Sequence, residues 1–71
     1  MDEDFVLLEC IKGICKNDAI LFPTDIVEIL LISTDKEGNM DIDIKVIESK
    51  VCKGLETVIS GEDLVNHFKY K

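Results

Sequence analysis

The stretch IVEILLISTDKEGNMDIDIKVIE, residues 26–48, decides the fold because it has the pattern of two β-strands joined by a tight turn. Ile26–Ser33 is apolar at nearly every position, which is typical of a strand in the centre of a sheet. Met40–Val46 alternates between apolar and polar residues, which is the period of a strand with one buried face. Its apolar face takes Met40, Ile42, Ile44 and Val46, and its polar face takes Asp41, Asp43 and Lys45.

The turn between these strands also has a defined pattern. Asp35-Lys36-Glu37-Gly38 has the form of a type I turn followed by a glycine in the left-handed region, a G1 bulge. Aspartate at the first position accepts hydrogen bonds from the backbone ahead of it, and glycine takes a positive φ without a Cβ clash. This geometry predicts pairs of Leu30 with Ile44 and Ile32 with Ile42 on the buried face, and of Leu31 with Asp43 on the other face.

Short apolar segments flank this hairpin and are separated by turn residues. Phe5–Ile14 is the first candidate strand, and Ala19–Phe22 is a shorter one that ends at Pro23. Leu55–Ile59 is a last short strand, and the ten isoleucines of the chain favour β structure throughout. The pattern predicts a small, mainly β domain of about five short strands.

The C-terminus changes from the strand period to the helix period. Ser60-Gly-Glu-Asp63 has the spacing of a capping box, and its two acids favour the positive end of a helix. Leu64, Val65 and Phe68 then share one helical face, which predicts a short helix over 60–68 that caps the sheet. We expect one domain over residues 1–71, with 1–4 as a flexible acidic tail.

The order of these elements resembles an SH3-like small β-barrel. The resemblance covers most of residues 5–68 and depends on a first strand, an irregular arm ending in FPTDIVEIL, a tight hairpin, a short strand and the terminal turn SGEDLVNHF. Such barrels often open the second strand with Gly-Asp and two apolar residues. Here Pro23-Thr24-Asp25-Ile26-Val27 stands in that place without the glycine. The resemblance implies a fold and no particular function, because barrels of this kind host many.

The charge of the chain excludes several classes of partner. The net charge is −7, and residues 1–45 carry all of it, with eleven acids and four lysines. The chain contains no arginine, the residue that makes bidentate contacts with phosphates and guanines. Direct binding to nucleic acid or to an anionic membrane is therefore disfavoured, and a basic protein would be attracted. A nucleic-acid-binding ring of SH3-like or Sm-like subunits remains a remote alternative, because it requires a local basic surface.

The chain shows no pattern of export. Its Met-Asp-Glu-Asp start lacks the positive region of a signal peptide, and Glu9 interrupts the first apolar run. No apolar run approaches the roughly 20 residues needed to span a bilayer. Three cysteines are an odd number without a secretory context, so we expect reduced thiols and a cytoplasmic protein.

Neither of two candidate metal-site patterns fits the sequence. The acids around Gly38 do not have the calcium-loop pattern, in which the glycine comes sixth and a glutamate closes the loop. Cys10, Cys15, Cys52 and His67 contain the ligand types of a zinc site, but only one close cysteine pair is present. The sequence also has no glycine-rich phosphate loop and no base placed to activate a nucleophile. We predict no catalytic residue, no metal and no cofactor.

Two functions remain. The first is a small acidic protein-interaction module or inhibitor, of the kind a phage or mobile element encodes, which docks its acidic hairpin on a basic partner site. Its partner-binding residues would be Asp35, Glu37, Asp41 and Asp43, with Glu28 or Asp25 as outlying members. The acids could equally serve only to keep a hydrophobic small domain in solution. The second function is a self-assembling, non-catalytic subunit, a homo-oligomer in which apolar edges such as Ala19–Phe22 or Val27/Ile29/Leu31 pair between copies.

Overall fold

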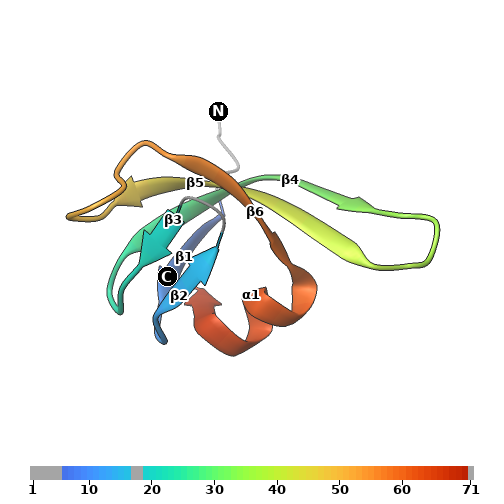
Figure 1. The fold of residues 1–71 in the computed structure, drawn as a ribbon, viewed down its shortest axis with the longest axis horizontal. Coiled ribbons are helices and arrows are strands. Elements are labelled where there is room, and N and C mark those ends of the chain that lie inside the picture. The colour runs from blue at the N-terminus through green and yellow to red at the C-terminus, as the bar shows by residue number, and fades with distance from the viewer. Residues whose placement is uncertain (1–5, 17–18, 71) are drawn as a thin grey trace.

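The computed structural model describes residues 6–16 and 19–70 and is mainly β, with one short helix near the C-terminus (Figure 1). This confirms the predicted mainly β class with a short C-terminal helix, although the described residues form seven strands where about five were predicted. The proposed acidic tail, residues 1–4, lies outside the described residues. The elements in chain order are β1 (Leu7–Cys10), β2 (Ile14–Lys16), β3 (Ala19–Leu21), β4 (Ile26–Thr34), β5 (Met40–Glu48), β6 (Glu56–Ser60), α1 (Gly61–His67) and β7 (Phe68–Tyr70).

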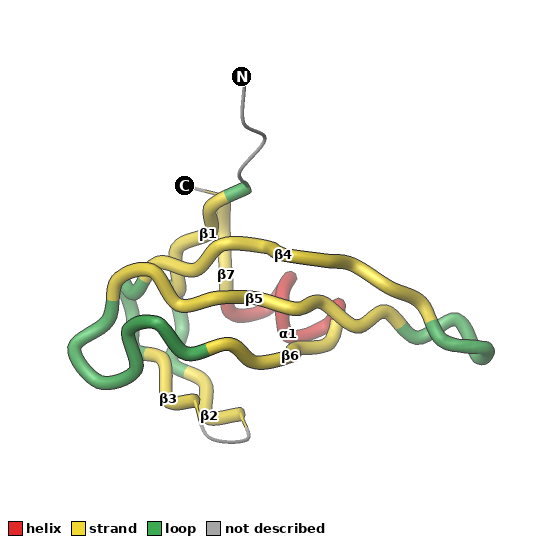
Figure 2. Tube along the Cα trace, turned by 90° about the horizontal axis from the view of Figure 1, so that it is seen from above, coloured by secondary structure: helices red, strands yellow, loops and turns green. Residues whose placement is uncertain are grey.

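Five strands form one antiparallel sheet in the order β6-β5-β4-β1-β7, and β2 and β3 form a separate hairpin. The last strand therefore lies beside the first, next to a meander of three strands, β4, β5 and β6. Among the described residues β6 and β7 are the two edges of this sheet, so the sheet is open. Figure 2 shows β4, β5 and β6 side by side, with β2 and β3 displaced from them.

The central hairpin forms as predicted at its turn. The Gly38 amide donates to the Asp35 carbonyl over 3.1 Å, and Gly38 has φ +87°. The Asp35 amide donates to the Asn39 carbonyl over 2.9 Å, which closes the loop at the ends of β4 and β5. This is the type I turn with a G1 bulge that the sequence indicates.

The register of β4 against β5 is partly as predicted. Leu31 lies opposite Asp43 and Ile32 opposite Ile42, as expected. The predicted pair of Leu30 with Ile44 is wrong, because Ile44 lies opposite Ile29. A β-bulge between Ile29 and Leu31 inserts Leu30 as an extra residue, which shifts the pairing by one position.

The core lies between the sheet and the elements folded under it. Its buried apolar residues are Leu8, Cys10, Leu21, Val27, Ile42, Ile44, Val46, Cys52, Ile59 and Phe68. The prediction that Leu30 and Ile32 lie on a buried face is wrong, because both are exposed. The β4–β5 hairpin runs on as an arm beyond the rest of the molecule (Figure 1), so its far part has no apolar layer to cover these side chains.

The segment before β4 contains an unusual backbone conformation. Asp25 donates its amide to the Phe22 carbonyl over 3.0 Å, which closes a turn with Pro23 and Thr24 at its centre. Thr24 has φ +80°, the left-handed region that favours glycine. The buried Asp25 carboxylate secures this turn, because it accepts hydrogen bonds from the Phe22 amide (2.9 Å) and the Ser49 hydroxyl (3.0 Å).

The C-terminal region is a helix followed by a strand. The capping box is confirmed: the Ser60 hydroxyl accepts from the Asp63 amide over 3.0 Å, and the Asp63 carboxylate accepts from the Ser60 amide over 3.5 Å. The helix ends at His67 rather than at Phe68, because Phe68 adopts an extended conformation as the first residue of β7. Phe68 and part of Leu64 face the core, whereas Val65 is 76% exposed and does not share their face.

The other strand boundaries also differ from those predicted. Phe5–Ile14 was expected as one strand, but β1 ends at Cys10 and Ile14 begins β2. Residues 11–13 wrap around the end of α1, since the Ile11 amide donates to the His67 carbonyl over 2.7 Å. This contact turns the chain away from the line of β1. Phe5 lies outside the described residues.

Candidate functional site

The acids of the hairpin tip serve the turn itself. One Asp35 carboxylate oxygen accepts hydrogen bonds from the amides of Glu37 and Asn39, each over 2.9 Å. The Asn39 side-chain amide lies 3.3 Å from Asp35 and 3.5 Å from Glu37. The hydrogen bond from the Asn39 backbone, the strongest of these effects, lowers the pKa of Asp35. Asp35 therefore holds the loop in shape, while the residue remains exposed.

Asp41 and Asp43 lie further along β5, on the side of the sheet that faces away from the core. The register places Asp41 between Ser33 of β4 and Ser60 of β6. It places Asp43 between two exposed apolar residues, Leu31 (59% exposed) and Val58 (40% exposed). Since facing residues in adjacent strands have neighbouring Cβ atoms, each aspartate lies beside the side chains of its row.

The next row of the same face is charged. Lys45 of β5 lies between Glu28 of β4 and Glu56 of β6. We refer to these three rows as the outer face, and its members are Glu28, Leu31, Ser33, Asp41, Asp43, Lys45, Glu56, Val58 and Ser60.

The outer face is acidic and contains two exposed apolar residues. Its centre is Asp43, which lies between Leu31 and Val58, and the rows on either side add the carboxylates of Asp41, Glu28 and Glu56 and a single lysine, Lys45. The ion pairs found in residues 6–16 and 19–70 are Lys16–Asp63 (2.9 Å) and Lys69–Glu9 (3.9 Å), neither of which involves this face. The carboxylates of the outer face are thus available to a basic partner.

Some residues of the outer face were predicted from the sequence. The structure brings together Asp41, Asp43 and Glu28, which were proposed as partner-binding residues, and places Asp35 and Glu37 at the hairpin tip instead. Asp25 is buried and hydrogen-bonded within the turn before β4. The sequence analysis did not assign Glu56 and Val58 to this face, although the alternation within β6 was a signal. The loop between β5 and β6 has no pattern that fixes how β6 pairs with β5, so the residues of β6 that lie beside Asp43 and Lys45 could not be predicted.

The residues considered as zinc ligands have other roles. The Cys10 thiol donates to the Lys12 carbonyl over 3.2 Å, and burial raises the pKa of this thiol. Nδ1 of His67 lies 3.0 Å from the same Lys12 carbonyl, so this histidine fastens the loop after β1 to the end of α1. Cys15 is exposed. Within the described ranges, no group of three or more His, Cys, Asp or Glu is arranged to hold a metal ion.

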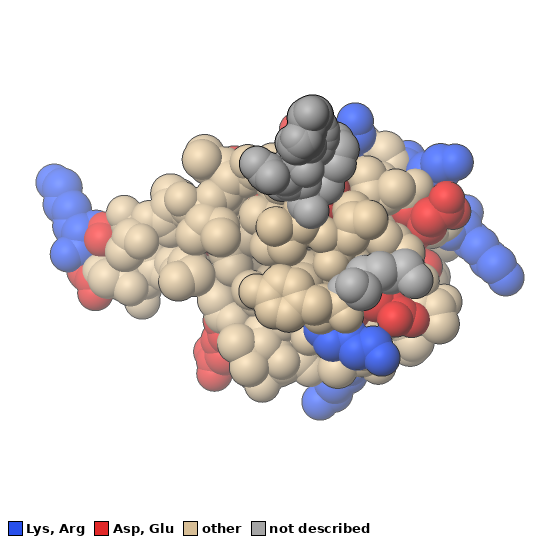
Figure 3. Space-filling model, turned by 180° about the vertical axis from the view of Figure 1, so that it is seen from behind, with Lys and Arg blue, Asp and Glu red and all other residues tan. Residues whose placement is uncertain are grey.

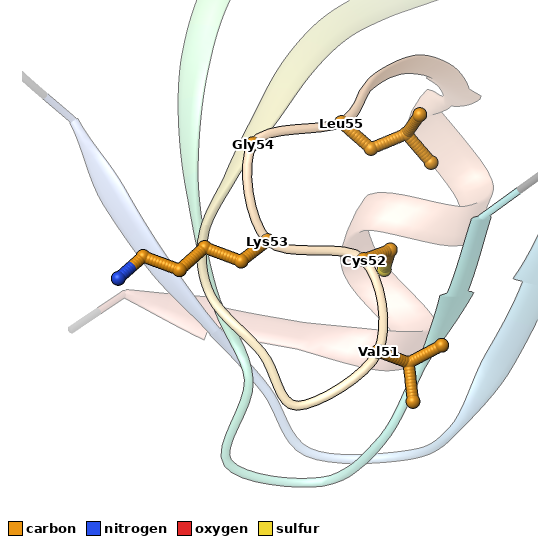
Figure 4. Close-up of a pocket in the computed structure, with 5 residues that line it drawn as sticks. All are labelled: Val51, Cys52, Lys53, Gly54 and Leu55. Atoms are coloured by element: carbon orange, nitrogen blue, oxygen red, sulfur yellow. The ribbon is translucent and has the colours of Figure 1, made fainter.

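A shallow hollow lies in the loop between β5 and β6 (Figure 4). It is lined by five consecutive residues, Val51–Leu55, so it is a dip within one loop and not a cleft between elements. Figure 4 shows Lys53 directed to the opposite side from Val51, Cys52 and Leu55. The Cys52 thiol is occupied, because it donates to the Ile20 carbonyl over 3.2 Å. The hollow does not assemble a nucleophile with a base.

Comparison with family models, with curated proteins and with solved structures finds no match to this chain. No helix in the described part of the chain has the length and apolar character needed to cross a membrane.

Proposed function

We propose that this chain is a small, non-catalytic protein-interaction module that binds a basic partner protein through the outer face of β4, β5 and β6. The observation that carries the proposal is the arrangement of this face, in which Asp43 lies at the centre between the exposed side chains of Leu31 and Val58, and three further carboxylates lie in the adjacent rows. A basic partner surface can pair with these carboxylates and cover the two apolar side chains. The acidic hairpin tip, with Asp35 and Glu37, lies beyond this face.

The two kinds of residue would contribute differently. The carboxylates attract a basic surface and speed its approach, and they do so less at high salt. Leu31 and Val58 supply apolar area that is removed from water only in the complex, at about 25 cal/mol per Å². Asp43 lies between these two side chains, so it would be the most desolvated carboxylate and would need a cationic partner group.

The size of the face limits its affinity. Strands are about 4.8 Å apart and residues on one face repeat about every 7 Å, so three rows across three strands cover roughly 300 Å². A stable interface buries about 800 Å² on each partner. The outer face alone therefore predicts a weak, salt-sensitive complex, unless the partner reaches further surface.

The test is a capture experiment with two matched double variants. Asp41→Asn with Asp43→Asn removes two charges from the outer face, and Glu37→Gln with Glu48→Gln removes two exposed charges elsewhere. We expect tagged parent and control to recover the same basic protein from the host lysate in a fixed ratio, and the Asp41/Asp43 variant to lose it. Binding of the purified pair should weaken as salt rises from 50 to 300 mM. Equal recovery by both variants, or a complex indifferent to salt, would refute the proposal.

A further inference from the structure

Among the residues that the structure describes, the edge of β4 along the projecting arm has no neighbouring strand. β1 pairs with β4 over Ile26–Glu28, and the Ile29 amide donates to the Val6 carbonyl over 3.0 Å, just beyond this pairing. From Leu30 to Thr34, no strand in the described part of the chain lies beside β4 on this side. Within the described ranges, β4 is thus a central strand over its first half and an edge strand over its second.

The backbone groups on this edge can be assigned. The Asp35 amide points toward β5, because it donates to the Asn39 carbonyl. Along an antiparallel ladder, alternate residues direct their amide and carbonyl groups to opposite sides. Ser33 therefore bonds to β5, whereas Ile32 and Thr34 direct their N–H and C=O groups to the open edge. The Leu30 bulge shifts this alternation by one residue, which agrees with the Ile29 amide pointing toward β1.

This edge lacks the charges that usually protect an open strand. Leu30, Leu31 and Ile32 are 45%, 59% and 51% exposed, and the segment Leu30–Thr34 has no ionisable side chain. From behind, the arm is uncharged between its charged tip and the body of the molecule (Figure 3). An exposed apolar edge of this kind is a template for another strand.

The other open edges of the described strands differ from this one. β6 contains Glu56 and β7 contains Lys69, and charged residues on an edge discourage pairing. β3 is only three residues long, and its Ile20 carbonyl already accepts the Cys52 thiol. The edge of the β4 arm is therefore the best place for strand addition.

We propose that two copies of this chain associate through the β4 arm as a two-fold symmetric, antiparallel strand pair with Ser33 on the axis. In this register Ile32 of each copy lies opposite Thr34 of the second copy. These are the residues whose amides and carbonyls face the open edge, so the two pairs make four hydrogen bonds between the copies. This interface is made by the backbone edge of β4 and not by the carboxylates of the outer face, so it goes beyond the proposed function.

The charges of the arm are compatible with a second copy despite the net charge of −7. In the same register Leu31 lies opposite Asp35 of the second copy, the first residue after β4. No two acids face each other across the pair, and like charges placed directly opposite are what destabilises such pairs. The segment is self-complementary, which a two-fold interface requires.

The first test measures mass in solution at 10–200 µM by analytical ultracentrifugation. We expect the parent to have twice the chain mass at the upper end, and Ile32→Lys to have the chain mass throughout. Val65→Lys is the matched control, because it adds the same charge at an exposed position of α1. Circular dichroism checks that each variant is folded. A parent that is monomeric at 200 µM, or an Ile32→Lys variant that remains dimeric, would overturn the proposal.

The second test determines the register between the two β4 strands by disulfide cross-linking. Ser33 occupies a non-hydrogen-bonded position of the proposed pair, where Cα atoms are about 4.5 Å apart, within the range a disulfide spans. Ser33→Cys should form a cross-linked dimer under oxidised glutathione, well above the background from the exposed Cys15 in the parent. Lys53→Cys, an exposed position in the loop after β5, is the control. Equal cross-linking of the two variants, or a dimer that Ser33→Cys does not cross-link, would refute the strand pairing.

Discussion

Replacing Thr24 with glycine should stabilise the fold. Thr24 has φ +80°, and its side chain is exposed. A β-branched residue rarely adopts this conformation, because its Cβ substituents crowd the backbone. The amide of Thr24 donates to the Cys10 carbonyl over 2.7 Å, and glycine preserves that hydrogen bond.

The magnitude follows from two opposing effects on the free energy of unfolding. The left-handed conformation costs a residue with a Cβ about 1–2 kcal/mol of folding free energy, and Thr24→Gly removes this cost. Glycine makes the unfolded chain more flexible, which offsets about 0.5–1 kcal/mol of that gain. The net stabilisation should be about 0.5–1 kcal/mol. The hydrogen bonds from the Phe22 amide and the Ser49 hydroxyl to Asp25 now hold the turn despite the strain.

The assay is urea unfolding followed by circular dichroism, with Thr24→Ala as the control. Alanine retains the Cβ, so it keeps most of the strain and should change stability by less than about 0.5 kcal/mol. A small domain has a denaturant slope of about 1 kcal/mol per molar urea, so Thr24→Gly should raise the midpoint by about 0.5–1 M relative to the parent. A midpoint for Thr24→Gly at or below that of Thr24→Ala would show that the turn is not strained.

Three further outcomes are expected. Gly38→Ala should lower the free energy of unfolding by about 1 kcal/mol, because Gly38 has φ +87°; an unchanged urea midpoint would contradict this. The Lys16 ammonium lowers the pKa of Asp63 below its ordinary 3.8, so the stability this carboxylate provides is present above pH 4 and is lost as the pH falls through the lower folded value. Asp63→Asn should flatten the dependence of the urea midpoint on pH between pH 5 and 2, and parallel curves would refute the contribution. Cys15 should react first with a thiol reagent in the folded protein, since burial raises the pKa of Cys10; simultaneous reaction of all thiols would argue against the fold.

The sequence predicted those features that depend on neighbouring residues. The Asp35–Gly38 turn and the Ser60–Asp63 capping box were found because their chemistry lies within four or five consecutive positions. The alternation over Met40–Val46 placed Met40, Ile42, Ile44 and Val46 on one face, of which the last three are buried and Met40 is 44% exposed. Local rules were sufficient here because each residue type has one favoured place in the element concerned.

The features that were missed depend on contacts between distant segments. The bulge at Leu30 is a property of how β4 fits β5, and nothing in IVEILLIS distinguishes Leu30 from its neighbours. Phe68 continued the helical pattern, yet it leaves the helix because β1 offers a strand partner opposite Cys10. The residues of the outer face can be assigned only when the register of β6 against β5 is known, so alternation alone did not place Glu56 and Val58 on it.

The two proposals use different parts of the same strand and can fail separately. Leu31 and Glu28 belong to the outer face, whereas the open edge is defined by the backbone of Ile32 and Thr34. Ile32→Lys changes the edge without removing a carboxylate, and the Asp41/Asp43 variant leaves the edge intact. If both proposals hold, the two-fold pair joins two sheets into one and places two outer faces side by side, with Ser33 between them. That would double the roughly 300 Å² of one face and offer a basic partner two contacts at once, so the second contact would form at a high effective concentration. Ile32→Lys should then weaken partner binding without altering a single residue of the outer face, while Val65→Lys should not.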